Sequence, residues 1–319
     1  MNTEIAFLGI DTSCYTSSLC LLNAEGKLVA EARRLLTVPS GRCGLQQSEM
    51  VYQHTRNLPE LMNEVWNGHK FKILGIGVSA KPRPLEDSYM PAFLAGLGLA
   101  KSLSTALAVP VYTLSHQENH LEAGVWSAGG PVAGRFLLLH ASGGTTDLLL
   151  AERGGAGEHY RLSQLGGSID LHAGQFVDRV GVALGLGFPC GPALEKLAGK
   201  AKEPWPVPVS VRGLQISLSG PATAALRAAK GGAEPAALAA GVQLAIGKAF
   251  AKLLLNGAAA AQVQDVLLVG GVGANASIRQ MIEAKLAAKS VRLWVPDPHF
   301  SGDNASGCAA FAWRRGVQS

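Results

Sequence analysis

Short apolar runs alternate with polar turns at the start of the chain and predict three strands. The segment IAFLGIDTSCYTSSLCLLNAEGKLVAEARRLL places a Ser/Thr-rich turn after the first apolar run and a turn at Glu25-Gly26 after the second. The elements expected beyond it are a helix with one apolar face near 49–67, a buried strand at 73–80, an apolar helix at about 91–107 and a strand at 109–115. Strands that alternate with helices indicate an α/β fold.

The pattern of the opening restarts in the middle of the chain. The segment RFLLLHASGGTTDLLLAE repeats the order apolar strand, Gly/Ser/Thr turn, apolar strand. This repetition predicts two similar α/β halves, residues 1–130 and residues 131–319. The second half continues with Ala-rich helices between 222 and 262, a buried strand at 265–271 and a final loop and helix. Pro235 suits the first turn of one of these helices.

Composition supports a folded protein and excludes a disordered one. The 319 residues include 16% charged side chains, 48% apolar ones and 39 glycines, which fits two domains with sizeable cores. The most apolar late stretch, GVQLAIGKAFAKLLLNGAAAA, is interrupted by Lys248 and Lys252, and no basic segment precedes an apolar one at the N-terminus. We therefore expect neither a membrane span nor a signal peptide. Five scattered cysteines without a CxxC pair indicate reduced thiols in a cytoplasmic protein. These cysteines are Cys14, Cys20, Cys43, Cys190 and Cys308.

The net charge of +5 comes from the second half of the chain. Residues 1–130 hold 10 basic and 11 acidic side chains, whereas residues 131–319 hold 18 basic and 12 acidic ones. A phosphate-rich partner such as nucleic acid would explain the excess, and so would solvated lysines that keep an apolar protein soluble. Charge alone leaves both interpretations open.

Three turns follow apolar strands and combine small residues with hydroxyl groups or backbone donors. They are IDTSCYTSS at 10–18, HASGGTTD at 140–147 and GGVGANAS at 270–277. Small residues let the backbone approach a phosphate, and the free amides of a turn or helix N-terminus bind anions. Each turn alone is weak evidence, because most Gly-rich turns are only tight turns. Together, two hairpins and a strand–turn–helix unit over two similar halves are typical of the two-lobed actin, heat-shock-chaperone and sugar-kinase fold, with duplicated mixed sheets.

His116 and His120 are four residues apart, so on a helix both imidazoles lie on one face and can reach one ion. The alternative is an ordinary helix start, with Ser115 as the N-cap and Glu118 as its capping-box partner. The spacing favours neither interpretation over the other. A third ligand must come from elsewhere, and Asp303, after the apolar segment VRLWVP, is an accessible carboxylate at a strand-to-helix turn.

Seven segments stand in a specific order along the chain. They are LGIDTSC at 8–14, AKSLSTALAVPVYTLSHQENH at 100–120, HASGGTTDL at 140–148, SIDLHAGQFVDRVGVALGLGFPCGP at 168–192, SLSG at 217–220, LVGGVGAN at 268–275 and SGDNA at 301–305. In order and spacing they resemble the tRNA threonylcarbamoyladenosine transferases, a family long labelled O-sialoglycoprotein endopeptidases. The resemblance covers nearly the whole chain.

The resemblance implies two sets of site residues and assigns no catalytic residue. His116, His120 and Asp303 would hold one divalent metal ion, iron or zinc, which suits neutral imidazoles with a carboxylate. The nucleotide-binding residues it implies are His140, Ala141, Ser142, Gly143 and Gly144 around the phosphate and carbamoyl groups, Gly174 and Gly191 where the backbone approaches closely, Asp178 at the ribose and Asn275 at the adenosine end.

The implied reaction transfers a threonylcarbamoyl group from threonylcarbamoyl-adenylate to the N6 amine of the adenosine 3′ of the tRNA anticodon. The metal would act as a Lewis acid and template at the carbamoyl oxygen. The implied partners are tRNA, threonylcarbamoyl-adenylate made by another enzyme, a paralogous actin-like subunit and an ATPase subunit, with no membrane. A sugar kinase is disfavoured, because such enzymes need a carboxylate base and a magnesium–phosphate site.

The chain departs from the usual residues of the family at several positions around the transferred group. These positions are Tyr15, Thr16, Lys81, Thr145, Gln175 and Pro221. They leave three alternatives to the main enzyme open: a divergent paralogue, a carbamoyl-type transferase for a small-molecule or protein acceptor, and a non-catalytic nucleotide-binding subunit.

Overall fold

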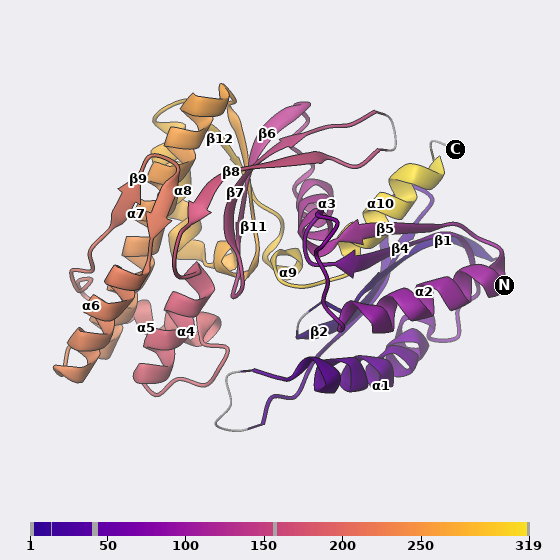
Figure 1. Ribbon diagram of the computed structural model, residues 1–319, viewed down its shortest axis with the longest axis horizontal. Coiled ribbons are helices and arrows are strands. Elements are labelled where there is room, and N and C mark those ends of the chain that lie inside the picture. The colour runs from indigo at the N-terminus through magenta and orange to yellow at the C-terminus, as the bar shows by residue number, and fades with distance from the viewer. Residues whose placement is uncertain (1–2, 14, 40–43, 156–157, 318–319) are drawn as a thin grey trace. The chain divides into compact units, whose positions relative to one another are not determined.

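The computed structural model describes residues 3–13, 15–39, 44–155 and 158–317, and their contacts divide the chain into two units (Figure 1). Unit 1 comprises residues 1–127, 153–160 and 303–319, and unit 2 comprises residues 128–152 and 161–302. Cys14 and Cys43 lie outside the described residues, whereas the other three cysteines are buried free thiols.

Unit 1 contains a five-stranded mixed sheet. Its strands are β1 (Glu4–Asp11), β2 (Thr16–Asn23), β3 (Leu28–Leu35), β4 (Phe71–Lys81) and β5 (Val111–Ser115). Their order is β3-β2-β1-β4-β5, in which the first three strands are antiparallel and β4 and β5 run parallel to β1. The predicted meander is therefore confirmed. Its second turn contains Gly26 at φ 72°, a left-handed conformation that favours glycine.

Helices cover both faces of this sheet. Ala6, Leu8 and Ile10 point from β1 to one face, where they share a buried cluster with α1 (Gln47–Trp66) and α2 (Phe93–Leu107). On the opposite face, α10 (Ser306–Val317) packs against β1, β2 and β4. Figure 1 shows α1 and α2 on the side of the sheet away from α10. The remaining helix, α3 (His116–Ala128), follows β5 without a loop.

Unit 2 contains a seven-stranded sheet that repeats the strand order of the first. Its strands are β6 (Arg135–Ala141), β7 (Thr146–Glu152), β8 (Arg161–Ser168), β9 (Ser210–Arg212), β10 (Gln215–Ser217), β11 (Asp265–Val269) and β12 (Arg292–Trp294). Within the order β12-β11-β6-β7-β8-β10-β9, the run β8-β7-β6-β11-β12 matches β3-β2-β1-β4-β5 of unit 1. The duplication expected from the repeated apolar pattern is therefore present as a repeated topology.

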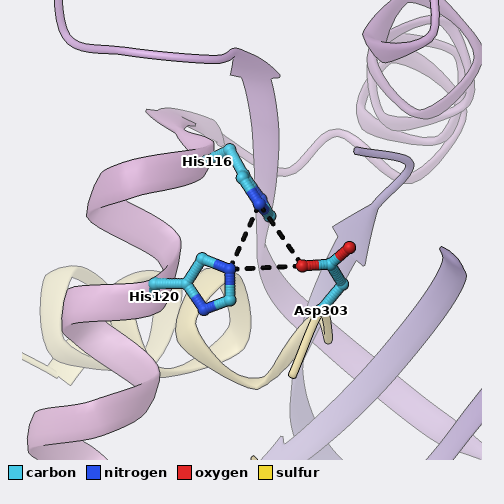
Figure 2. Close-up of side chains that lie close together, drawn as sticks. All are labelled: His116, His120 and Asp303. Atoms are coloured by element: carbon cyan, nitrogen blue, oxygen red, sulfur yellow. Dashed lines mark hydrogen bonds and ion pairs between the residues drawn. The ribbon is translucent and has the colours of Figure 1, made fainter. Parts of the chain in front are cut away.

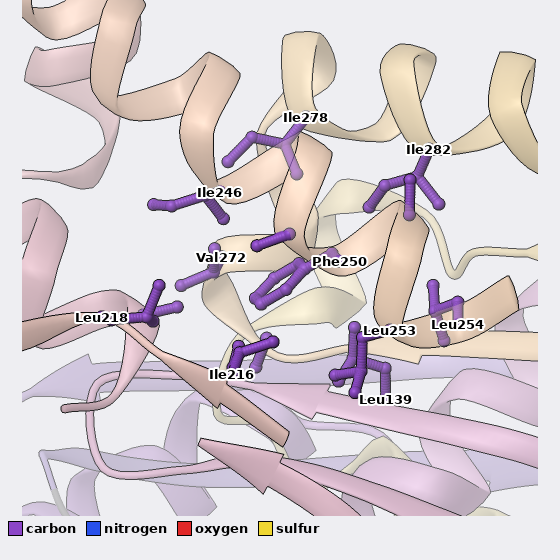
Figure 3. Close-up of a cluster of buried hydrophobic side chains, with 14 of the residues drawn as sticks. Leu139, Ile216, Leu218, Ile246, Phe250, Leu253, Leu254, Val272, Ile278 and Ile282 are labelled. Carbon is purple, nitrogen blue, oxygen red and sulfur yellow. The ribbon is translucent and has the colours of Figure 1, made fainter. Parts of the chain in front are cut away.

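The core of unit 2 lies between its sheet and a group of helices (Figure 3). The helices of the unit are α4 (Ala173–Ala183), α5 (Gly191–Ala198), α6 (Ser219–Lys230), α7 (Pro235–Ala261), the 3₁₀ turn η1 (Gly271–Ala274), α8 (Ala276–Ala287) and α9 (Pro298–Ser301). Phe250 and Leu253 of α7 are fully buried and share this core with Leu139 of β6. Among the described residues, α7 is the one helix long and apolar enough to cross a membrane. However, 72% of its most apolar segment is buried inside the fold, as in the core helix of a globular unit. Pro235 stands in its first turn, as predicted.

Candidate metal centre

Both histidines lie in the first turns of α3, and a capping box fixes the start of that helix. The backbone N–H and the hydroxyl of Ser115 donate to Glu118 Oε2, each at 2.7 Å, and the Glu118 N–H donates back to Ser115 Oγ at 3.2 Å. The capped helix start considered above is therefore confirmed. It does not replace the metal interpretation, because the same rigid first turn presents both imidazoles on one face.

Asp303 of unit 1 lies beside the two imidazoles (Figure 2). Asp303 Oδ1 is 3.4 Å from His116 Nε2 and 3.3 Å from His120 Nε2, and the two Nε2 atoms are 3.1 Å apart. Ligand atoms about 2.0–2.2 Å from one tetrahedral ion would be separated by roughly 3.4 Å. The three donors thus stand close to the spacing that a single metal ion requires, which makes this donor set fit a transition metal.

The electrostatics of the three groups are coupled. Burial raises the pKa of the Asp303 carboxyl, but hydrogen bonds with His116 and His120 and the charges of both rings hold it well below its usual range. Burial lowers the pKa of both imidazoles. At His116 the hydrogen bond with Asp303 and the charges of Asp303 and Asp11 outweigh burial and raise the pKa, whereas at His120 the charge of His116 adds to burial and lowers it. The site therefore offers an ionised carboxylate beside one imidazole that favours the neutral form.

Asp11, at the carboxyl end of β1, also lies beside the two imidazoles, although the sequence pattern predicted it only as part of a possible phosphate turn. Its side chain is fully buried, and its Oδ1 lies 3.9 Å from His116 Nδ1. It accepts hydrogen bonds from the hydroxyls of Ser13, at 2.6 Å, and Ser79. Metal-binding imidazoles commonly face a carboxylate with their second nitrogen. A carboxylate at the end of a buried apolar run was the available signal in the sequence.

A cavity of about 320 Å³ opens beside the start of α3 at the carboxyl ends of β4 and β5. Lys81, Ser115, Glu118 and His159 are among the residues that line it. Glu118 Oε1 accepts a hydrogen bond from His159 Nδ1 at 3.1 Å. Burial raises the pKa of the Glu118 carboxyl, but the hydrogen bonds from His159 and Ser115 outweigh burial and lower it. Lys81, one of the departures noted above, thus borders this cavity.

Two of the three predicted nucleotide turns lie side by side in unit 2. The turn after β6 is closed by a hydrogen bond from Ser142 N–H to Thr145 O at 2.8 Å, and Gly174 N–H of α4 donates to Ser142 O at 3.1 Å. A Cβ on Gly174 would lie 2.6 Å from Gly143 Cα, so this glycine is required by the protein's own turn. Gly270 of the third turn likewise abuts the backbone of Ala141. The remaining turn, at 10–18, belongs to unit 1.

The other nucleotide-binding candidates also belong to unit 2. His140 and Ala141 are buried at the end of β6, whereas Gly143 and Gly144 are exposed at the tip of the turn. Asp178 Oδ1 accepts the Cys190 N–H at 2.8 Å, and burial raises the pKa of its carboxyl. The remaining two are Gly191, which has open space where a Cβ would stand, and Asn275, whose side chain caps α8 by accepting the Ile278 N–H at 3.0 Å.

Comparison with known proteins extends these observations. A model of the family described as tRNA N6-adenosine threonylcarbamoyltransferase matches residues 48–310. A Thermus thermophilus protein of that name is 35% identical over 312 residues that cover 97% of this chain and 92% of that protein.

Solved structures of low sequence identity show the fold. Component A of the (R)-2-hydroxyglutaryl-CoA dehydratase of Acidaminococcus fermentans aligns with a TM-score of 0.56 at 16% identity, covering 98% of this chain and 99% of that one. A ROK family glucokinase from Streptomyces griseus aligns with a TM-score of 0.51 at 13% identity, covering 96% and 99%. The predicted actin, heat-shock-chaperone and sugar-kinase fold class is therefore confirmed.

Proposed function

The chain belongs to the tRNA N6-adenosine threonylcarbamoyltransferase family, and from that premise we propose that it completes threonylcarbamoyladenosine in tRNA. It would transfer the threonylcarbamoyl group of threonylcarbamoyl-adenylate to the N6 amine of the adenosine 3′ of the anticodon. The observation that carries the proposal is the convergence of His116, His120 and Asp303, which are up to 187 positions apart in sequence, on one point.

These three residues would hold one metal ion, iron or zinc. A bound ion supplies Lewis-acid polarisation of the carbamoyl oxygen, which favours attack by the amine. Asp303 is suited to the task because its carboxyl stays ionised beside the two rings. His120 is suited because its pKa is lowered, and a neutral imidazole is the form that ligates.

The adenylate would bind at the turns of unit 2. The exposed Gly143 and Gly144 leave the backbone of the turn open to a phosphate, and the turn is held against the N-terminus of α4, where helix amides favour anions. His140, Ala141 and Ser142 would complete the phosphate and carbamoyl region. The other proposed contacts are Asp178 at the ribose, Gly174 and Gly191 where the protein backbone would approach the nucleotide, and Asn275 at the adenosine end.

We propose tRNA as the acceptor, and a paralogous actin-like subunit and an ATPase subunit as partners, all in the cytoplasm. The excess of basic side chains in residues 131–319 is consistent with a polyanionic partner. Threonylcarbamoyl-adenylate would be supplied by a separate enzyme.

The test is reconstitution with unmodified tRNA, threonylcarbamoyl-adenylate and the partner proteins, followed by mass spectrometry of the tRNA nucleosides. We expect threonylcarbamoyladenosine with the wild-type chain and strong loss of product with the His116→Ala/His120→Ala variant. Absence of product with the complete set of partners would overturn the proposed acceptor. If metal and adenylate still bound, the result would favour transfer to a small molecule or a protein. If adenylate bound but metal did not, the result would favour a non-catalytic nucleotide-binding subunit.

A further inference from the structure

Asn119 stands between the two histidines in sequence but faces a different part of the fold. Its side chain is 1% exposed and reaches from α3 to the segment that carries Asp303. Its Nδ2 donates to the backbone carbonyl of Asn304 at 2.7 Å, and its Oδ1 accepts the backbone N–H of Cys308 at 2.8 Å. One buried amide therefore joins the helix of two ligands to the loop of the third.

The loop held by Asn119 is short and internally bonded. Asn304 directly follows Asp303, and its Oδ1 accepts the Ser306 N–H at 2.8 Å and the Ser306 hydroxyl, which fixes the entry into α10. A displacement of Asn304 relative to α3 would therefore be transmitted to Asp303 through one peptide unit.

The two helices also touch through their backbones at the same level. A Cβ placed on Gly307 of α10 would collide with the carbonyl oxygen of Asn119, so α10 can approach α3 this closely only with glycine there. The backbones of α3 and α10 lie in close contact here, and the side chain of Asn119 fixes how the two helices are aligned along that contact. Both hydrogen bonds of the Asn119 side chain go to backbone groups, so they do not depend on which side chains the loop carries.

We propose that Asn119 is a positioning residue for the metal site, setting the place of Asp303 relative to His116 and His120. This inference rests on the proposed metal site. Mutation of a group that orients a metal ligand without touching the ion commonly weakens metal affinity by about 10- to 100-fold. Asn119 would act on the ligand geometry through the loop backbone, because its own side chain is used by Asn304 and Cys308.

The experiment uses the full chain and Co²⁺, whose visible absorption reports the coordination geometry. Co²⁺ affinity is measured by competition with a chromophoric chelator, together with the spectrum and the melting temperature. Asn119→Ala should bind Co²⁺ about 10- to 100-fold more weakly and change the spectrum. Asn119→Asp keeps the acceptor for Cys308 but places an oxygen against the Asn304 carbonyl, so it should also weaken binding, and it carries the test if the alanine variant does not fold.

The matched control is Leu121→Ala. Leu121 is fully buried in the same helix. Its replacement by alanine removes a side chain about as large as that of Asn119, but leucine has no polar group that could bond to the loop. We expect this variant to melt at a lower temperature and to keep the wild-type Co²⁺ affinity and spectrum.

The outcomes separate the inference from the function on which it rests. A wild-type chain that does not bind Co²⁺ would overturn the metal site itself. Wild-type binding that is unchanged in Asn119→Ala would overturn the positioning role and leave the site intact. Equal weakening by Leu121→Ala would also overturn it, because loss of stability alone would then explain the effect.

Discussion

His116 is the proposed ligand whose protonation should limit metal binding. Burial lowers the pKa of its imidazole, but the hydrogen bond with Asp303 and the charges of Asp303 and Asp11 raise it above the ordinary value of 6.5. A proton on this ring must leave before the ring can ligate. We therefore expect Zn²⁺ affinity to increase with pH through about 6.5 and beyond, and to be weakest where the ring is fully protonated.

Replacement of Asp11 by asparagine tests this explanation. The Asp11→Asn variant removes one of the charges that raise the His116 pKa, so the rise in Zn²⁺ affinity should move to lower pH. Isothermal titration calorimetry between pH 5.5 and 8.5 would measure both profiles in several buffers. A profile that is the same in the variant would exclude Asp11 as a determinant of this titration.

Contacts between individual residues could be predicted from the sequence only where the two residues are close together along the chain. The spacing of His116 and His120 is local, so the sequence predicted that they share one helix face, and the structure confirms it. The side chains of Asp11 and Asn119 act on groups 105 and 185 positions away. No local pattern identifies such partners, because only the folded sheet and helices bring them together.

The N-terminus of helix α6 (Ser219–Lys230) is capped by the carboxylate of Asp170, which lies far from it in the sequence. Its N-cap residue, Leu218, has no side-chain acceptor, and Asp170 supplies one from the loop after β8. Asp170 Oδ1 accepts the Leu218 N–H at 2.9 Å, and Oδ2 accepts the hydroxyls of Ser217 and Ser219 at 2.6 and 2.5 Å. Burial raises the pKa of this carboxyl, but these bonds outweigh burial and lower it well below its ordinary value.

We expect Asp170→Ala to lower the free energy of unfolding by about 1 kcal/mol at pH 7, the usual effect of a lost cap at an exposed site. Because the folded-state pKa lies below the unfolded value of 3.8, the stability from the charged form is present above that pH and is lost as the pH falls below it. The difference between wild type and variant should therefore narrow in acid. Urea unfolding at several pH values measures it.

Asp170→Asn is the control for charge. The asparagine keeps one oxygen acceptor for the backbone N–H groups but does not titrate, so its stability deficit should be smaller at pH 7. An alanine variant as stable as wild type at pH 7 would contradict the capping role of Asp170.

Strands could be predicted from the sequence where nearly all their residues are apolar and buried, but not where apolar and polar, buried and exposed residues are mixed. The apolar runs of β1, β6 and β11 are nearly fully buried and were expected as strands. The strand β8 was not expected, because RLSQLGGS has little apolar patterning and is mostly only partly buried. Gly166 lies there because the carbonyl of Leu214 occupies the space of a Cβ, a contact between segments that the local sequence does not show.

The C-terminal segment, residues 303–319, belongs to unit 1 together with the N-terminal residues. Helix α10 brings Cys308 and Phe311 into the core of unit 1, against Leu114 of β5. Gly9 and Gly77, on β1 and β4, have no room for a Cβ because the backbone of α10 lies against them. Hydrophobic pattern predicted a final helix but not its place, since one apolar stripe can pack on either sheet. The boundary near residue 130 remains a sequence-based prediction.

Because α10 packs on the sheet of unit 1, Gly77 tests whether this packing affects the proposed metal site. In Gly77→Ala the new methyl group would collide with the Cys308 carbonyl, so α10 must move away from the sheet. Such overpacking costs about 1–3 kcal/mol. Since Asp303 lies just before α10, we expect both a lower melting temperature and weaker Zn²⁺ binding, measured by scanning calorimetry and by chelator competition.

Gly98 provides the matched glycine in the same unit. It lies in α2 with open space around the position of a Cβ, so Gly98→Ala should raise stability by about 0.5–1 kcal/mol through helix propensity and leave Zn²⁺ binding unchanged. If Gly77→Ala kept wild-type Zn²⁺ affinity despite a lowered melting temperature, the position of Asp303 would be independent of how α10 packs on the sheet. The hydrogen bonds of the loop at Asn304 and Cys308 would then be sufficient to hold Asp303 in place.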